Sequence, residues 1–387
     1  MSGNKNLMKK EYKYSIKCPY RVCPLGAHID HQLGRITGFA LDKGITIEFN
    51  VTEDGLIDVS SRNYGGRYVG NIHDFPEKQY AWSDYLIGAV DILKRQYALE
   101  KGIEGIVYGE LPAGGLSSSA AVIIVYLQAL CQANGIHMTQ PELISTAIKE
   151  ERNFIGVNVG KLDQSCEVYS KAEHLLYMDM RDDSCQLIST NPNMDDFEIA
   201  IIFTGKERQL VGSGYNTRVD ECKAAAYALL AFGDMNYGRY ADTVLRDVPY
   251  GIYQEHSKQL PVNWHKRAEH FYTEMQRVKD GVQAWKNGDI EKFGRLVYDS
   301  GASSIYNYET GSKELIALHD IMKNVDGIYG SRFSGAGFNG CSLALVNPKK
   351  KDSISEEIKE RYLKLYPEYQ DKFFVTYCKT ADGVKMI

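Results

Sequence analysis

Residues 111–121 read Leu111-Pro112-Ala113-Gly114-Gly115-Leu116-Ser117-Ser118-Ser119-Ala120-Ala121 and run into an apolar segment, 122–130. This order predicts a strand end, a tight loop and a helix start. Glycines let backbone N–H groups approach a ligand closely, and a helix start presents unpaired N–H groups at the positive end of its dipole. The loop therefore predicts an anion site, with phosphate as the natural ligand. The serine hydroxyls would either cap the helix or reach a metal ion.

Length and composition point to a globular protein of two domains. The chain has 387 residues, 44% of them apolar, and a formal net charge of −5 without a basic stripe, which argues against a nucleic-acid partner. Its eight cysteines show no metal-ligand spacing. The first 17 residues lack the apolar core of a signal peptide, and no apolar run is long enough to span a membrane. We therefore expect a soluble cytoplasmic protein.

The hydrophobic pattern mixes strands and helices in both halves, so the predicted class is α+β. Strands are expected at 44–51, 56–60, 105–109, 174–180, 197–203, 341–346 and 373–380. Helices are expected at 82–97, 119–133, 140–153, 216–232, 264–285, 290–299 and 313–322. A linker rich in Pro, Asn and Asp, 191–196, suggests a domain boundary that separates residues 1–193 from 194–387.

Two further glycine motifs resemble nucleotide loops. Residues 156–162 are one residue too short for a Walker A loop and carry Leu162 where a Ser or Thr would meet the metal, so this interpretation is rejected. Gly335, Gly337 and Gly340 have dinucleotide-loop spacing, but they precede a β-like run near the C-terminus. They are better interpreted as a turn where the backbone approaches another group closely.

Several polar residues stand out from their surroundings. Glu151 continues the apolar face of the predicted helix 140–153, so it is either a partly exposed helix-end residue or a ligand. Asp163 is either a helix N-cap or a general base. The stretch from Arg21 to His31 concentrates donors and acceptors that would suit a sugar or a phosphate, while its histidine spacing is weak for a metal.

Together these stretches resemble the GHMP sugar kinases of the galactokinase branch. Residues 21–31 resemble the signature R-V-N-L-I-G-E-H-T-D-Y, and 115–120 resemble the phosphate loop G-L-S-S-S-A, although the preceding segment is one residue shorter than usual. Residues 151–164, 215–222 and 333–341 resemble further family motifs in the same order. The resemblance implies a ribosomal S5-like N-terminal domain, a ferredoxin-like helical C-terminal domain, and ATP and Mg²⁺ as cofactors.

The resemblance also implies residue roles. Asp163 would be the catalytic base, and Arg21 would hold it ionised and stabilise the transferring phosphoryl group. Ser119 and Glu151 would bind Mg²⁺. The sugar-site positions are Ala27, His28, Asp30, Gly160 and Tyr215. The ATP-site positions are Trp82, Tyr85, Pro112, Gly114, Gly115, Leu116, Ser117, Ser118, Ser119 and Ala120. Gly335 and Gly337 would form a glycine-rich site loop. For Trp82 and Tyr85, helix-face packing is an alternative.

One departure bears on the substrate. Galactokinases place Glu before the signature His, where it hydrogen-bonds the C6 hydroxyl of galactose, and this chain has Ala27. Losing that acceptor would weaken galactose binding by about 1–3 kcal/mol. A C6 carboxylate would be repelled by Glu and tolerated by Ala. The stretch 18–32 is most similar to galacturonokinases, which implies phosphorylation of D-galacturonate at O1; His28 could contact the carboxylate, and Lys161 or Arg35 could add charge.

Two other functions remain open. One is a galactokinase with a relaxed C6 pocket, which would make α-D-galactose 1-phosphate. The other is a non-catalytic sugar sensor on the same fold, which the presence of Arg21, Glu151 and Asp163 disfavours. In each case the partner is a small sugar or sugar acid, and the sequence does not indicate an oligomeric state.

Overall fold

The computed structural model describes residues 11–74, 77–157, 159–206, 214–337 and 340–387. Its strands are β1 (Tyr14–Val22), β2 (Arg35–Thr52), β3 (Leu56–Ser61), β4 (Arg67–Asn71), β5 (Gly102–Gly109), β6 (His174–Asp179), β7 (Ser184–Ser189), β8 (Glu198–Phe203), β9 (Ile328–Phe333), β10 (Cys341–Val346), β11 (Phe374–Cys378), β12 (Thr380–Ala381) and β13 (Lys385–Met386). Its helices are α1 (Asp84–Lys94), α2 (Ser118–Asn134), α3 (Gln140–Glu150), α4 (Leu162–Tyr169), α5 (Tyr215–Phe232), α6 (Tyr250–His256), α7 (Val262–Lys286), α8 (Ile290–Tyr306), α9 (Lys313–Met322) and α10 (Lys351–Leu365).

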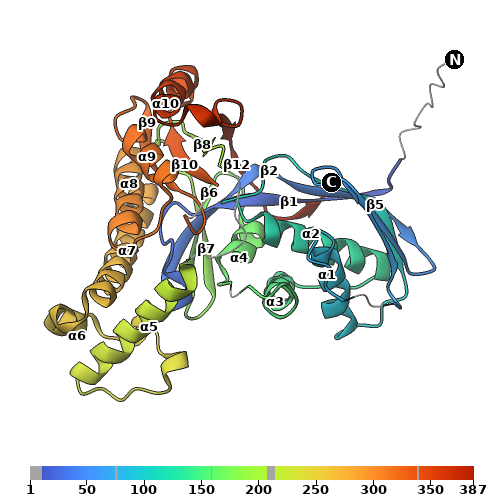
Figure 1. Ribbon diagram of the computed structural model, residues 1–387, viewed down its shortest axis with the longest axis horizontal. Coiled ribbons are helices and arrows are strands. Elements are labelled where there is room, and N and C mark those ends of the chain that lie inside the picture. The colour runs from blue at the N-terminus through green and yellow to red at the C-terminus, as the bar shows by residue number, and fades with distance from the viewer. Residues whose placement is uncertain (1–10, 75–76, 158, 207–213, 338–339) are drawn as a thin grey trace.

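The larger sheet has the order β13-β1-β2-β5-β3-β4, and β2 also pairs with β6 and β12. Helices α1 to α4 lie together on one side of this sheet (Figure 1). The helix α2 is apolar on every side, so it is buried as the central helix of this layer. Because α2 begins at the serine loop, this packing fixes the loop against the sheet.

The second, smaller sheet has the antiparallel order β11-β8-β10-β9. It lies with α7 to α10 at one end of the molecule (Figure 1). Apolar side chains of α9 and α10 pack on β8 and β10 in a core of their own. After β11, the chain returns to the larger sheet, where β12 pairs with β2 and β13 with β1.

The predicted class, α+β, is confirmed, and the glycine-rich segment does form a turn, between β9 and β10. The predicted helix 140–153 was wrong in its second part, because α3 ends at Glu150 and a single π-helical turn, Glu151–Ile155, follows. The elements that were not predicted are strands β1, β4, β7 and β9, the short C-terminal strands β12 and β13, and helices α4, α6 and α10. The boundary near residue 193 stays a prediction and falls between β7 and β8.

Candidate active site

A cavity of about 430 Å³ lies where the two parts of the chain meet. The N-terminal part contributes the ends of β1 and α2, the loop after β1 and the segment before α4, and the C-terminal part contributes the end of β9 and the turn after it. Predicted site residues on its wall are Arg21, Ala27, His28, Asp30, Ser119, Glu151, Gly160, Asp163 and Gly335. The structure therefore brings together residues that lie more than 300 positions apart in the sequence.

Arg21 and Asp163 form an ion pair inside this cavity. The Nε and Nη2 atoms of Arg21 lie 2.8 and 2.7 Å from Oδ1 of Asp163. Burial alone would lower the pKa of Arg21, but the charge of Asp163 raises it above its ordinary value. The side chain of Asp163 keeps 25% of its surface exposed, against 6% for Arg21. The guanidinium is thus a fixed partner, and the carboxylate remains accessible to a ligand.

Asp163 is not the N-cap that one interpretation gave it. Lys161 occupies the cap position of α4, and Asp163 lies in the first turn of that helix. Its carboxylate therefore does not cap the start of this helix. The choice left open by the sequence is decided here in favour of a side chain directed to the cavity.

Asp30 and Gly160 contact each other at one wall of the cavity. A Cβ atom on residue 160 would lie 1.9 Å from Oδ2 of Asp30, so a larger residue there would displace this carboxylate from its position. Burial and the nearby charge of Asp163 raise the pKa of Asp30 to about 6. A carboxyl group with this pKa can accept or donate a hydrogen bond near neutral pH, which suits contact with a sugar hydroxyl.

Glu151 is buried, with 4% of its surface exposed, because the π-helical turn redirects the chain after α3. The expectation of a partly exposed helix-end residue was therefore wrong. Gln164 donates a hydrogen bond from Nε2 to Oε2 of Glu151 at 2.8 Å. Single π-helical turns are frequent at functional sites. Glu151 and Ser119 share the cavity wall, so one carboxylate and one hydroxyl face the same space.

The serine loop has the backbone of an anion site. Gly114 and Gly115 have φ values of +135° and +83°, and Ser117, the N-cap of α2, has φ +61°. Ser117 makes no side-chain capping hydrogen bond, and within the described part of the chain its buried Oγ has no hydrogen-bond partner. Helix α2 therefore does not begin with a side-chain N-cap, which was one of the two expected roles of the serines. The first N–H groups of α2 are left for a ligand.

The glycine-rich turn packs directly on the serine loop. A Cβ atom on Gly335 would lie 3.0 Å from Cα of Gly115, and one on Gly340 would lie 2.8 Å from the carbonyl carbon of Gly114. Ser334 donates a hydrogen bond from Oγ to the Gly115 carbonyl at 2.6 Å. Because the two backbones touch, the position of the serine loop depends on the turn after β9.

We expect Gly335→Ala to raise KM for the phosphate-donor nucleotide about tenfold, since a left-handed alanine costs about 1–2 kcal/mol and its Cβ would push on Gly115. Initial rates against nucleotide concentration measure the effect. The matched control is Gly135→Ala, at the other end of α2, where φ is +65° and a Cβ atom would meet nothing within 4 Å. Equal KM values in both variants would contradict the role of the backbone contact.

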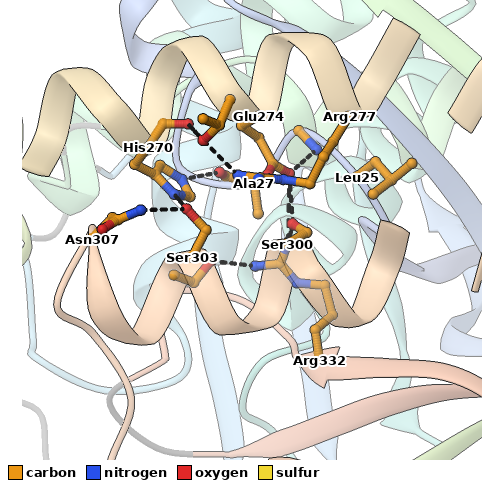
Figure 2. Close-up of polar contacts among 12 residues, drawn as sticks. Leu25, Ala27, His270, Glu274, Arg277, Ser300, Ser303, Asn307 and Arg332 are labelled. Atoms are coloured by element: carbon orange, nitrogen blue, oxygen red, sulfur yellow. Dashed lines mark hydrogen bonds and ion pairs between the residues drawn. The ribbon is translucent and has the colours of Figure 1, made fainter. Parts of the chain in front are cut away.

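The loop after β1, which carries Ala27, is held by the C-terminal helices. Nε2 of His270 lies 3.0 Å from the carbonyl oxygen of Ala27, and the Gly26 N–H donates to Oε1 of Glu274 at 2.7 Å. Arg277 donates to the other Glu274 oxygen at 2.6 Å. Figure 2 shows Ala27 between α7 above and α8 below, next to these side chains.

Burial would raise the pKa of Glu274, but Arg277 above all lowers it to about 2. Glu274, His270 and Arg332 were missed from the sequence. Only Glu274 could have been recognised from the sequence, because it lies at helical spacing between Phe271 and Val278 on the buried face of α7.

Several predicted residues are not on the cavity wall or lie outside the described residues. Of the serine loop and the glycine-rich turn, this holds for Pro112, Gly114, Gly115, Leu116, Ser117, Ser118, Ala120 and Gly337. Trp82 and Tyr85 are half-buried at the start of α1, pack against the main core and are not on the cavity wall. The adenine role and the packing alternative therefore both stand. Pro112 is exposed on the serine loop. Tyr215 begins α5, and its side chain lies outside the described residues.

The cations suggested for a C6 carboxylate are engaged with other groups. Lys161 lies 2.6 Å from Oδ2 of Asp183, and Arg35 lies 2.8 Å from Oδ2 of Asp179. Neither belongs to the wall of the cavity that contains Arg21 and Asp163. A further cation on that wall, which the sequence analysis did not name, is Arg332.

Comparisons with known proteins show the family to which the chain belongs. Residues 84–171 match the family model of the GHMP kinases N-terminal domain, and 282–364 match that of the GHMP kinases C-terminal domain. The chain is 35% identical to a galacturonokinase of Arabidopsis thaliana, over 96% of this chain and 93% of the relative. It is 30% identical to a galactokinase of Clostridium acetobutylicum, over 99% and 97%. The crystal structure of Lactococcus lactis galactokinase complexed with galactose matches with a TM-score of 0.87 and 26% identity, over 96% and 94%.

A two-part α+β fold that places a serine-rich loop beside an Arg–Asp pair is the arrangement expected of a small-molecule kinase. The chain belongs to the GHMP kinases, in the branch that contains the galactokinases and galacturonokinase. It is an ATP-dependent sugar phosphotransferase. Among the residues that the structure describes, no helix is long and apolar enough to cross a membrane.

Proposed function

We propose that the chain phosphorylates the anomeric hydroxyl of D-galacturonate to give α-D-galacturonate 1-phosphate. The observation that carries this proposal is Ala27 on the cavity wall, at the position where the family places the glutamate that contacts C6. A methyl group there adds no negative charge, so a C6 carboxylate meets no repulsion from this position. The similarity to the Arabidopsis galacturonokinase supports the same substrate.

In the proposed reaction, Asp163 accepts the proton of the anomeric hydroxyl as its oxygen attacks phosphorus. Arg21 holds the carboxylate in place through two short contacts to Oδ1 and adds positive charge beside the transferring phosphoryl group. Asp30, backed by Gly160, would bind a sugar hydroxyl and fix the ring. Phosphoryl transfer needs positioning and charge more than covalent help, which these fixed groups provide.

The residues on the cavity wall also fit a magnesium nucleotide. Mg²⁺ prefers few protein oxygens together with phosphate oxygens, and Glu151 with Ser119 offers one carboxylate and one hydroxyl. The uncapped start of α2 and the orphan Ser117 hydroxyl would bind the phosphates. When bound, the metal would neutralise charge that develops on the phosphates. Trp82 and Tyr85 stay the proposed adenine contacts.

A coupled ADP-release assay with D-galacturonate, D-glucuronate, D-galactose and N-acetylgalactosamine tests the proposal. We expect the highest kcat/KM for galacturonate, with activity lost when Mg²⁺ is omitted. A higher kcat/KM for galactose would refute the galacturonate assignment. If ATP binds but none of these sugars supports ADP release, the sugar-sensor alternative would be favoured.

Ala27→Glu tests the C6 argument. Because the new carboxylate would face a substrate of the same charge, we expect kcat/KM for galacturonate to fall about tenfold or more relative to galactose. The control Ala98→Glu adds the same charge at an exposed position after α1. The readout is the ratio of kcat/KM for the two sugars, and a ratio unchanged in Ala27→Glu would contradict the assignment of C6 to this wall.

The alternative is a galactokinase, favoured by the fold match to an enzyme complexed with galactose. The same substrate panel separates the two. A small sugar or sugar acid as partner, without nucleic acid or membrane, and a cytoplasmic location belong to the proposal as well.

A further inference from the structure

We propose that Arg332, together with Nε2 of His28, forms the binding site for the C6 carboxylate of the substrate. We call these two side chains the carboxylate seat. This inference rests on the proposed function and names the groups that would select a sugar acid over a neutral sugar. Arg332 comes from β9 and His28 from the loop after β1, and both lie on the wall of the catalytic cavity with Ala27.

Arg332 is a buried cation whose hydrogen bonds hold its position. Its side chain is 1% exposed. Nε donates to the carbonyl of Phe333 at 3.2 Å, Nη1 to Ser300, and Nη2 to Ser304 at 3.1 Å. Figure 2 shows the side chain reaching from its strand to α8, beneath the Ala27 loop. A guanidinium has more N–H donors than these bonds use, so donors remain for a ligand.

The positive charge of Arg332 is only partly balanced. Its ion-pair partner among the described residues is Glu274, whose Oε1 lies 3.9 Å from Nη1. Glu274 is closer to Arg277, at 2.6 Å, so two guanidinium groups share one carboxylate. Burial lowers the pKa of Arg332, and Glu274 offsets this only in part. Since a buried, under-compensated charge is costly, a ligand carboxylate at this wall would stabilise the site.

His28 offers a donor beside this charge. It is 6% exposed, and its buried Nε2 has no hydrogen-bond partner among the described residues. The ring stacks on Tyr308 at a centroid distance of 4.6 Å, and the backbone has φ +64°, which is uncommon for a residue other than glycine. Burial and then the charge of Arg332 lower the pKa of His28, so the ring is neutral and can donate from Nε2 to a carboxylate.

Ala27 explains why the seat suits a substrate carboxylate. A glutamate at position 27 would place its own carboxylate at the wall that Arg332 and His28 share, and would use the charge of Arg332. With alanine, that charge is available to the sugar. The alternative cations Lys161 and Arg35 pair with Asp183 and Asp179 and do not reach this wall.

The first experiment uses the unmodified protein. Initial rates are compared for D-galacturonate and its methyl ester, which removes the charge at C6 and adds one methyl group. We expect kcat/KM to fall at least about tenfold for the ester, the size of one lost charge-assisted hydrogen bond. Equal values would overturn the seat while leaving the kinase function intact. Failure to phosphorylate galacturonate at all would instead refute the proposed function.

The second experiment assigns the groups. In Arg332→Gln, kcat/KM for galacturonate is expected to fall about 10–50-fold relative to galactose, and Arg332→Lys should recover part of the ratio. Asn tolerates the left-handed backbone, but its amide ends short of the position of the His28 Nε2, so His28→Asn should lower the ratio less than Arg332→Gln. The matched control is Arg295→Gln, which removes a guanidinium from the exposed face of α8, away from Glu274 and the cavity wall, and should leave the ratio unchanged. Equal losses for both sugars in Arg332→Gln would overturn the assignment. If this variant does not fold, the comparison of galacturonate with its methyl ester in the unmodified protein tests the assignment instead.

Discussion

Asp163→Asn is expected to lower kcat by about 10²–10⁴-fold, the range for removal of a positioned general base. The amide keeps the size of the side chain and can still accept a hydrogen bond from Arg21, but it cannot take the proton of the sugar hydroxyl. KM for the sugar should change little, because the cavity wall keeps its shape. Steady-state kinetics with a coupled ADP assay measures both constants.

The control for this variant is Asp183→Asn, which also removes a carboxylate charge close to α4. Asp183 is exposed and pairs with Lys161 at 2.6 Å, away from the catalytic cavity. Its kcat should equal that of the unmodified enzyme, because exposed ion pairs contribute little. If Asp163→Asn retained most of its activity while binding both substrates, Asp163 would not be the base.

Glu274→Ala is expected to lower the free energy of unfolding by about 3–5 kcal/mol, the cost of removing one partner from a buried ion pair. Arg277, the Gly26 N–H and the Ser300 hydroxyl would all lose their shared acceptor. The loop that carries Ala27 would lose one of its two polar contacts with α7 as well and keep the one from His270. Chemical denaturation measures the change in stability.

Asp280→Ala is the control on the same helix, because Asp280 accepts an exposed hydrogen bond from Gln276. The pKa of Glu274 is about 2 in the folded protein, below its ordinary value of 4.5. A depressed pKa gives stability that is present above pH 4.5 and is lost as pH falls toward 2. Glu274→Ala should therefore show a weaker loss of stability between these pH values, and an unchanged acid dependence would contradict the buried ion pair.

Much of the fold could be predicted from local patterns. Helices α2, α5, α7 and α9 could be predicted because their apolar residues recur at helical spacing or because typical capping residues mark their ends. Strands β2 and β8 could be predicted from their runs of apolar residues. Strand β4 is short and mostly polar, and β7 is exposed at nearly every position, so neither has the apolar pattern that identifies a strand. The π-helical turn after Glu150 could not be predicted, because it depends on tertiary packing and no residue type specifies it.

The candidate site divides in the same way. The serine loop, Asp163 and Glu151 stand in local motifs, so their residue types and spacing were enough to select them. Arg332 and Glu274 act through contacts between β9, α7 and the loop after β1, which no local pattern reports. Glu274 could have been selected from the sequence, because it is an acidic residue on the apolar face of α7. The same kind of signal selected Glu151, at the end of the apolar face of the predicted helix 140–153.

The long sequence separations inside the cavity have a consequence for how the enzyme forms. Arg21 and Asp163 are 142 residues apart, Gly115 and Ser334 are 219 apart, and Gly26 and Glu274 are 248 apart. Each contact closes a long loop, and that entropy is lost before the contact stabilises anything. During refolding, helices such as α2 can form early, while the cavity is completed only when both ends of the chain have docked. Recovery of catalysis is thus a late event, and a fragment that stops before β9 cannot contain the assembled site.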